Sequence, residues 1–151
     1  MKLLEGKVAI VTGAARGIGK AIALKFAAEG ANIAFTDLVI DENGEATQKE
    51  IEALGVKAKG YASNAANFEE THNVVAEIVK DFGRIDILVN NAGICKLNKV
   101  LDFGRADWDP MIDVNLTAAF ELSYEAAKIM IPQKSGKIIN ICSLFSYLGG
   151  Q

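Results

Sequence analysis

A glycine-rich segment near the start of the chain, residues 12–19, has the residue types of a phosphate-binding turn. It reads TGAARGIG and places Gly13, Gly17 and Gly19 between a continuous apolar run and an amphipathic stretch. Glycines let a backbone approach a pyrophosphate closely, and the N-terminus of a following helix carries partial positive charge. The spacing differs from the GxGxxG of many dinucleotide folds. Its place between a predicted strand and a predicted helix nevertheless favours a dinucleotide site over a tight turn without a ligand.

Asp37 and Arg16 bear on which dinucleotide would bind. Asp37 ends the second predicted strand, where a carboxylate can accept hydrogen bonds from both adenosine-ribose hydroxyls and would repel a 2′-phosphate. Arg16 has the opposite tendency, because a guanidinium beside the ribose can pair with a 2′-phosphate. A solvated turn residue is the alternative for Arg16. We therefore predict NAD, with NADP as the alternative.

Short apolar runs alternate with longer amphipathic stretches, and these elements must position the turn and the carboxylate. Strands are predicted over residues 8–11, 32–36, 56–61, 85–89 and 137–141. Helices are predicted over residues 17–29, 45–54, 68–82 and 111–130, the last following a loop that reaches Trp108. Strands separated by helices indicate right-handed βαβ units, an α/β fold and a parallel sheet.

Composition excludes several classes of function. The 151 residues are 50% hydrophobic with a net charge of −3, which argues against disorder and against nucleic-acid binding. No apolar run approaches the ~20 residues that a membrane helix needs, and charge appears too early for a signal peptide. Cys95 and Cys142 form no CxxC pair, and His72 is the single histidine. We expect a cytoplasmic protein with reduced thiols, no metal site and His72 on a helix surface.

Four motifs together resemble the short-chain dehydrogenase/reductase family. They are the glycine-rich turn, Asn90–Gly93, Val114-Asn115 and the strand-end segment 138–143, and the resemblance runs from Lys7 to Gln151. It implies a Rossmann-like, doubly wound parallel sheet with strand order 3-2-1-4-5. It also implies one NAD(P)-binding domain over residues 1–151, the N-terminal portion of the family fold without its C-terminal part.

The same resemblance assigns cofactor contacts residue by residue. Asn64-Ala65 stands where the family often has Asp-Val against adenine, and an asparagine amide can still hydrogen-bond the ring. Asn90 is expected to be structural. The expected cofactor-binding residues are Gly13, Arg16, Gly17, Ile18, Gly19, Asp37, Leu38, Asn64, Ala65, Asn91, Ala92 and Gly93.

For catalysis, the resemblance assigns Ser143 to the substrate oxygen and Asn115 to a water-holding role. The family's proton-donating tyrosine and its lysine, in a YxxxK motif, are expected beyond Gln151. Tyr124 and Lys128 have that spacing but precede Ser143. Helical geometry puts Tyr124 on the side of the long helix opposite Asn115. Tyr147 has Gln151 where the lysine would stand, so neither tyrosine is predicted to be the donor.

The two halves resemble different members of the family. Residues 3–94 are similar to 3-oxoacyl-carrier-protein reductases, and residues 95–151 are similar to sugar-acid dehydrogenases acting on gluconate or 2-dehydro-3-deoxygluconate. We expect an oxidoreductase that interconverts a secondary alcohol and a ketone on a sugar acid. Lys96 or Lys99 is a candidate for binding its carboxylate, although solvated loop lysines are the favoured alternative. The alternatives are a 3-oxoacyl reductase and a nucleotide-binding module without turnover.

The expected end of the sheet has a consequence for assembly. The fifth strand is expected at an exposed edge, and Phe120, Leu122 and Ile129 are expected to face water. Such an apolar patch favours self-association, so we expect a homo-oligomer.

Overall fold

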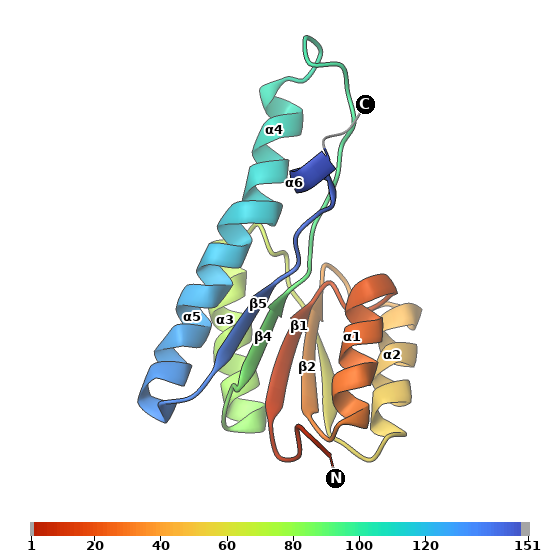
Figure 1. Cartoon of the computed structure of the whole chain (residues 1–151), viewed down its shortest axis with the longest axis vertical. Helices are drawn as coiled ribbons and strands as arrows, with labels where there is room; N and C mark the ends of the chain where they lie inside the picture. Colours follow the sequence, from red (N-terminus) through yellow and green to blue (C-terminus); the bar gives the residue numbers. More distant parts are fainter. Residues whose placement is uncertain (1, 149–151) are drawn as a thin grey trace.

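The computed structural model describes residues 2–148, which form one parallel sheet with helices on both faces (Figure 1). The strand order is β3-β2-β1-β4-β5, as predicted. The strands are β1 (Val8–Thr12), β2 (Asn32–Asp37), β3 (Ala58–Ala62), β4 (Ile87–Asn90) and β5 (Lys137–Asn140). The helices are α1 (Gly17–Ala28), α2 (Glu42–Glu52), α3 (Phe68–Phe82), α4 (Arg105–Ile112), α5 (Ala118–Gln133) and α6 (Phe145–Leu148).

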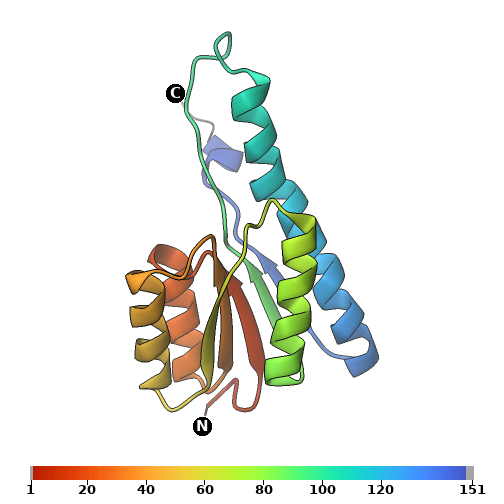
Figure 2. The ribbon, with the colours of Figure 1, turned by 180° about the vertical axis from the view of Figure 1, so that it is seen from behind.

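Two hydrophobic clusters, one on each face, hold the sheet between its helices. The central strands β1 and β4 are buried along their whole length, which explains their continuous apolar sequence. On one face, α1 and α2 cover a cluster that includes Val11 and Phe35 (Figure 1). On the other, α3 and α5 cover a cluster that includes Ile10 and Ile78 (Figure 2).

Side-chain caps define where two helices begin. The Asp41 carboxylate accepts hydrogen bonds from the backbone N–H groups of Asn43 and Gly44, so α2 begins at Glu42, earlier than the predicted residue 45. Asn67 caps α3 in the same way, at the predicted start. Such an oxygen satisfies a backbone N–H group that would otherwise be unpaired at the helix start. The period of apolar residues alone does not show where this capping residue stands.

The long helix differs from its prediction at its start and in its middle. It begins at Arg105 rather than at residue 111, so Trp108 lies within α4 and not in a loop. Residues Asp113–Thr117 form a π-helical turn that joins α4 to α5. Pro110 lies inside α4 and Pro132 in the last turn of α5, where each removes only one helical hydrogen-bond donor.

The fifth strand is an exposed edge, as predicted, because within residues 2–148 β5 pairs only with β4, and all four of its residues are exposed. Phe120 is also exposed, at 65%. The prediction for Leu122 is wrong. Its side chain is 5% exposed and, together with the partly buried Ile129, packs in the cluster beneath α3. Among residues 2–148, no helix is both long enough and apolar enough to cross a membrane.

Candidate functional site

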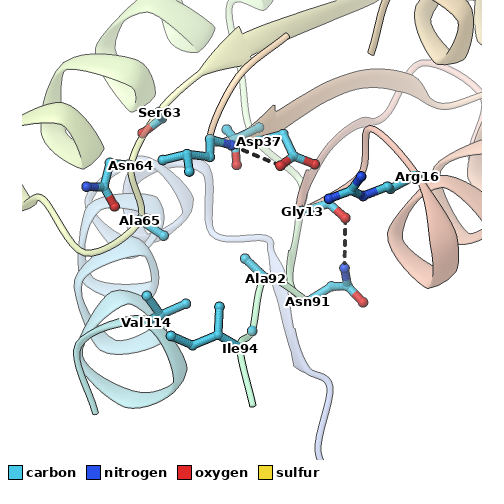
Figure 3. Close-up of a pocket in the computed structure, with 13 residues that line it drawn as sticks. Gly13, Arg16, Asp37, Ser63, Asn64, Ala65, Asn91, Ala92, Ile94 and Val114 are labelled. Atoms are coloured by element: carbon cyan, nitrogen blue, oxygen red, sulfur yellow. Dashed lines mark hydrogen bonds between the residues drawn. The ribbon is translucent and has the colours of Figure 1, made fainter. Parts of the chain in front are cut away.

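A pocket of about 290 Å³ opens at the carboxyl ends of the central strands. It lies where the chain order reverses between β1 and β4, the position at which open α/β sheets bind ligands. Its volume is near the lower end of the range for small-molecule sites, about 300–1,000 Å³. Thirteen residues line it (Figure 3): Gly13, Arg16, Thr36, Asp37, Leu38, Ser63, Asn64, Ala65, Asn91, Ala92, Gly93, Ile94 and Val114.

The glycine-rich turn is held against the end of β4 by a close backbone approach. Gly13 has a φ of 63°, which side-chain-bearing residues rarely adopt. A Cβ built on Gly19 would overlap the Gly13 carbonyl oxygen and lie 2.6 Å from Asn91 Nδ2. The Asn91 amide donates to the carbonyl oxygens of Thr12, at 2.9 Å, and Gly13, at 3.2 Å. Asn91 therefore fixes the turn in addition to lining the pocket.

The start of α1 has no side-chain cap for its backbone donors. Arg16 occupies the N-cap position and makes no side-chain cap, and the first turn contains no acidic residue. Helix N-termini with unsatisfied N–H groups bind anions. Gly17 and Ile18 are exposed at this terminus, whereas Gly19 is buried against the turn. These three predicted cofactor residues do not line the pocket itself, and their predicted contacts would come from the helix start.

Asp37 is oriented at the end of β2 by two backbone N–H groups. Its Oδ2 accepts from Ala15 N at 3.0 Å and its Oδ1 from Leu38 N at 2.9 Å. Its carboxylate points toward the loop that carries Arg16 (Figure 3). Asp41, the cap of α2, is a second carboxylate on which the charge of Arg16 acts. Hydrogen bonds from Gly44 and Asn43 hold the pKa of Asp41 below its usual value, and the Arg16 charge acts in the same direction.

Residues after β3 form the third side of the pocket. Ser63, Asn64 and Ala65 follow the strand, and the Asn64 side-chain oxygen accepts from the backbone N–H of Ala66 at 3.1 Å. This bond orients the Asn64 amide within the turn. The predicted contact of Asn64 with adenine stays a prediction.

Asn115 and Ser143, the predicted catalytic residues, lie outside the pocket lining. Asn115 is in the π-helical turn, and its amide exchanges two hydrogen bonds with the backbone of Ile94, both of 2.9 Å. It thereby ties the long helix to the segment that follows β4. Ser143 is exposed after β5, and its hydroxyl accepts from the backbone N–H of Phe145 at 3.2 Å. The structure does not test their catalytic roles.

Sequence reasoning missed four lining residues, namely Thr36, Ser63, Ile94 and Val114. Each is next to a predicted site residue. Thr36, Ser63 and Ile94 lie at or just beyond the carboxyl end of a strand, which was the available signal, whereas Val114 lies in the π-helical turn beside Asn115. Asn90, expected to be structural, donates from its amide to Asn140 Oδ1 at 2.8 Å and to Ser123 Oγ at 3.1 Å. It links β4 to β5 and α5.

Tyr124 and His72, which are not predicted from the sequence to belong to the site, lie elsewhere, whereas the Tyr147 side chain and Gln151 are outside the described part of the chain. Tyr124 is 52% exposed on α5, and the Lys128 ammonium lies 4.4 Å from the centre of its ring. His72 on α3 is on the surface, but its Nδ1 lies 3.3 Å from the buried Glu125 carboxylate, a contact that the sequence did not predict. Burial opposes ionisation of Glu125, yet Lys128 and His72 hold its pKa below the usual value. Among the described side chains, no group of three or more His, Cys, Asp or Glu residues is arranged to hold a metal ion.

A family model decides how this geometry is classified. The model described as short chain dehydrogenase matches residues 7–150, almost the whole chain. The chain belongs to the short-chain dehydrogenase family. This confirms the family resemblance, and the strand order confirms the predicted fold. The short-chain dehydrogenases are oxidoreductases that use NAD or NADP.

Similar curated proteins include both of the enzyme classes that the two halves of the sequence resemble, a sugar-acid dehydrogenase and a 3-oxoacyl-[acyl-carrier-protein] reductase. An uncharacterized oxidoreductase of Escherichia coli, YgcW, is 64% identical over 98% of this chain and 56% of that protein. A 2-dehydro-3-deoxy-D-gluconate 5-dehydrogenase of Pseudoalteromonas atlantica is 44% identical, over 97% of this chain and 58% of that protein. A 3-oxoacyl-[acyl-carrier-protein] reductase of Staphylococcus epidermidis is 41% identical, over 95% and 59%. The chain thus spans less than three fifths of the length of these relatives.

Solved structures are similar in the same region. An NAD⁺-bound xylitol dehydrogenase has a TM-score of 0.93 and 35% identity, over 99% of this chain and 57% of that one. A metagenomic short-chain oxidoreductase in complex with NADP has a TM-score of 0.89 and 40% identity, over 93% and 64%. Bound nicotinamide cofactors in these two structures agree with the predicted class of cofactor.

Proposed function

We propose that the pocket binds NAD, with residues 1–151 acting as one dinucleotide-binding domain. Asp37 carries this proposal, because its oriented carboxylate lies where it can accept hydrogen bonds from adenosine-ribose hydroxyls. The N-terminus of α1 would hold the pyrophosphate, with the close approach of Gly13 and Gly19 leaving room for it. Asn64 and Ala65 would contact the adenine, and Ala92 and Gly93 would line the path toward the nicotinamide.

The proposed reaction interconverts a secondary alcohol and a ketone. A bound nicotinamide dinucleotide would supply or accept the hydride. Ser143 would donate a hydrogen bond to the substrate oxygen, where negative charge develops as a ketone is reduced. Asn115 would hold the segment after β4 in place through its two hydrogen bonds to Ile94, and so fix the shape of the substrate side of the pocket.

A sugar acid is the proposed substrate, supported by the similarity to the 2-dehydro-3-deoxy-D-gluconate 5-dehydrogenase. A lysine of the loop after β4 would pair with its carboxylate. The Lys96 ammonium already lies 3.0 Å from the Asp107 carboxylate, which favours Lys99 for this role. A 3-oxoacyl thioester is the runner-up, supported by the similarity to the acyl-carrier-protein reductase.

Turnover assays distinguish these activities from binding alone. Neither Tyr61 nor Tyr124 lines the pocket, and Tyr61 donates its hydroxyl to Asp81 at 2.7 Å. This favours a third candidate, a nucleotide-binding module, for residues 1–151 alone. We expect this chain to bind NADH without oxidising it in the presence of 2-dehydro-3-deoxygluconate or a 3-oxoacyl thioester. Steady NADH oxidation would show that a proton donor exists within residues 1–151, and the faster substrate would identify the class.

Self-association and a cytoplasmic location complete the proposal. Leu116, Phe120, Tyr124 and Ile131 expose apolar surface along one helix, and a second copy of the chain would cover it. Cys95 and Cys142 are free and exposed, which fits a reducing compartment.

A further inference from the structure

The buried side-chain hydroxyl of Thr47 on α2 contacts the glycine-rich turn at Ala15. Ala15 precedes Arg16 and also contacts Asp37, and these are the two residues expected to influence dinucleotide choice. The Thr47 side chain is fully buried, and its Oγ1 donates to the carbonyl oxygen of Ala15 at 2.8 Å. Ala15 is itself 5% exposed, and its N–H donates to Asp37 Oδ2 at 3.0 Å. Both peptide groups of Ala15 are therefore held, one by Asp37 and the other by Thr47.

The peptide that Thr47 holds is the one that leads into Arg16. Fixing the Ala15 carbonyl fixes the plane of the Ala15–Arg16 peptide, and hence the direction in which Arg16 leaves the turn. Arg16 and Asp37 both line the pocket and act in opposite directions, because a carboxylate repels a 2′-phosphate and a guanidinium attracts it. The positions of Arg16 and Asp37 therefore both depend on the backbone of Ala15.

The helix that carries Thr47 is itself anchored at two further points. Gln48 accepts from the backbone N–H of Gly60 on β3 at 3.0 Å, and Glu50 pairs with Lys20 of α1 at 2.8 Å. These contacts, with the Asp41 cap, leave α2 little freedom to follow a movement of the turn. Thr47 therefore ties the turn to a helix that is itself held in place.

We propose that Thr47 is a positioning residue for dinucleotide selectivity, acting through the Ala15 peptide groups to hold the Asp37 carboxylate toward the ribose. This proposal rests on the proposed function, since it presupposes that the pocket binds a nicotinamide dinucleotide. Loss of the hydroxyl frees the Ala15–Arg16 peptide and loosens the bond between Ala15 N and Asp37 Oδ2, so that the carboxylate proposed to accept from the ribose is held less firmly. NADH binding should weaken while NADPH binding is kept or improved.

The test compares NADH and NADPH dissociation constants for the wild-type chain, Thr47→Val and Thr47→Ser, by fluorescence titration. Valine keeps the branched shape without the donor, and we expect the ratio of NADPH to NADH dissociation constants to fall about fivefold to tenfold, as for one lost hydrogen bond. Serine keeps the donor and should preserve the ratio. Thr71→Val is the matched control, because Thr71 is 1% exposed in α3 on the opposite face of the sheet.

Each outcome bears on a different claim. If the wild-type chain binds neither dinucleotide, the proposed function fails. If it binds NADH but Thr47→Val keeps the wild-type ratio, or Thr71→Val lowers the ratio equally, the positioning role fails and the proposed function stands. Should Thr47→Val not fold by circular dichroism, Thr47→Ala removes the same donor without overpacking the site and is read by the same ratio.

Discussion

At the scale of single residues, Asp37 is expected to set the preference between the two dinucleotides. Replacing it by asparagine removes the negative charge and one charged acceptor while keeping the shape. We expect the NADPH-to-NADH ratio of dissociation constants to fall by at least about tenfold, because hydrogen bonds to charged groups contribute about 1.5–3 kcal/mol. Titration of each variant with both dinucleotides measures it. Asp109→Asn, an exposed carboxylate of α4, makes the same charge change outside the pocket and should leave the ratio unaltered.

Gly19 is expected to be required for the shape of the turn. In Gly19→Ala the new Cβ meets the Gly13 carbonyl, Ala14 Cα at 2.9 Å and the Asn91 amide, and two of these are backbone atoms that cannot rotate away. Overpacking of this kind costs about 1–3 kcal/mol. Calorimetry should therefore show a lower melting temperature, and titration a weaker NADH affinity. Gly104→Ala adds its Cβ into open space and should leave NADH affinity unchanged; tight NADH binding by Gly19→Ala would mean that the turn is not held as described.

Residue types in their sequence context were enough to locate most of the pocket. Nine of the twelve predicted cofactor residues line it, since glycines, a strand-end aspartate and Asn91–Gly93 carry local signals. The four missed lining residues are threonine, serine, isoleucine and valine, which are common in any strand or helix. The contact of Thr47 with Ala15 was beyond prediction, because period assigns a residue to a buried face but not to a partner.

At the scale of elements, Asp86 anchors the starts of β1 and β4. Its carboxylate is 4% exposed, accepts from the backbone N–H of Val8 at 3.0 Å, and takes a two-point contact from Arg84 at 2.8 and 2.7 Å. Asp86→Asn leaves this cluster incomplete and should lower the free energy of unfolding by about 2–4 kcal/mol. Urea denaturation checks this, with Asp102→Asn in an exposed loop as the control. A loss for Asp86→Asn no larger than that of the control would contradict the anchoring role.

The buried carboxylate of Glu125 joins α5 to α3 and predicts a dependence of stability on acid pH. Its folded pKa lies below the ordinary value of 4.5, so its stabilising contribution is fully present above pH 4.5. That contribution is lost as the pH falls through the folded pKa. Asp86, with a pKa lowered from 3.8, adds a loss in the same direction at lower pH. Glu125→Gln should therefore flatten the fall in melting temperature below about pH 4.5.

Scanning calorimetry across acid pH, with Glu77→Gln on the exposed face of α3 as the control, measures this effect. The control should keep the wild-type acid profile. An unchanged profile for Glu125→Gln would show that its pairing with Lys128 and His72 contributes nothing to the stability of the helix pair.

Elements with a strong period were predictable, including residues 111–130 of the long helix, but the start of that helix at Arg105 was not. The strands and α1 to α3 follow from apolar runs, helical period and glycine stops, although the start of α2 after its Asp41 cap was missed. The start of α4 carries few apolar positions and a proline, so its sequence looks like a loop. The π-helical turn at Asn115 depends on two hydrogen bonds to Ile94, a distant segment, and no local pattern indicates it.

At the scale of the whole molecule, the apolar stripe formed by Leu116, Phe120, Tyr124 and Ile131 along the long helix is expected to mediate self-association. Phe120 and Ile131 are 65% and 72% exposed, and Phe120 stacks on Tyr124 with ring centres 6.4 Å apart. Phe120→Glu introduces a charge that a second copy would have to bury, so light scattering after size exclusion should show a smaller species than for wild type. Leu101 is also apolar and is 95% exposed in a loop, so Leu101→Glu is the control and should not change the measured mass of the assembly. A monomeric wild-type chain at high concentration would exclude the stripe as an interface.

The pocket at the ends of β1, β2 and β4 is proposed to bind NAD in preference to NADP. Titration of the wild-type chain with NADH and, separately, with NADPH, followed by the fluorescence of the reduced nicotinamide, tests it most directly. We expect saturable binding of both dinucleotides and a lower dissociation constant for NADH. Tighter binding of NADPH would show that Arg16 rather than Asp37 sets the preference, and the absence of saturable binding by either dinucleotide would contradict the site itself.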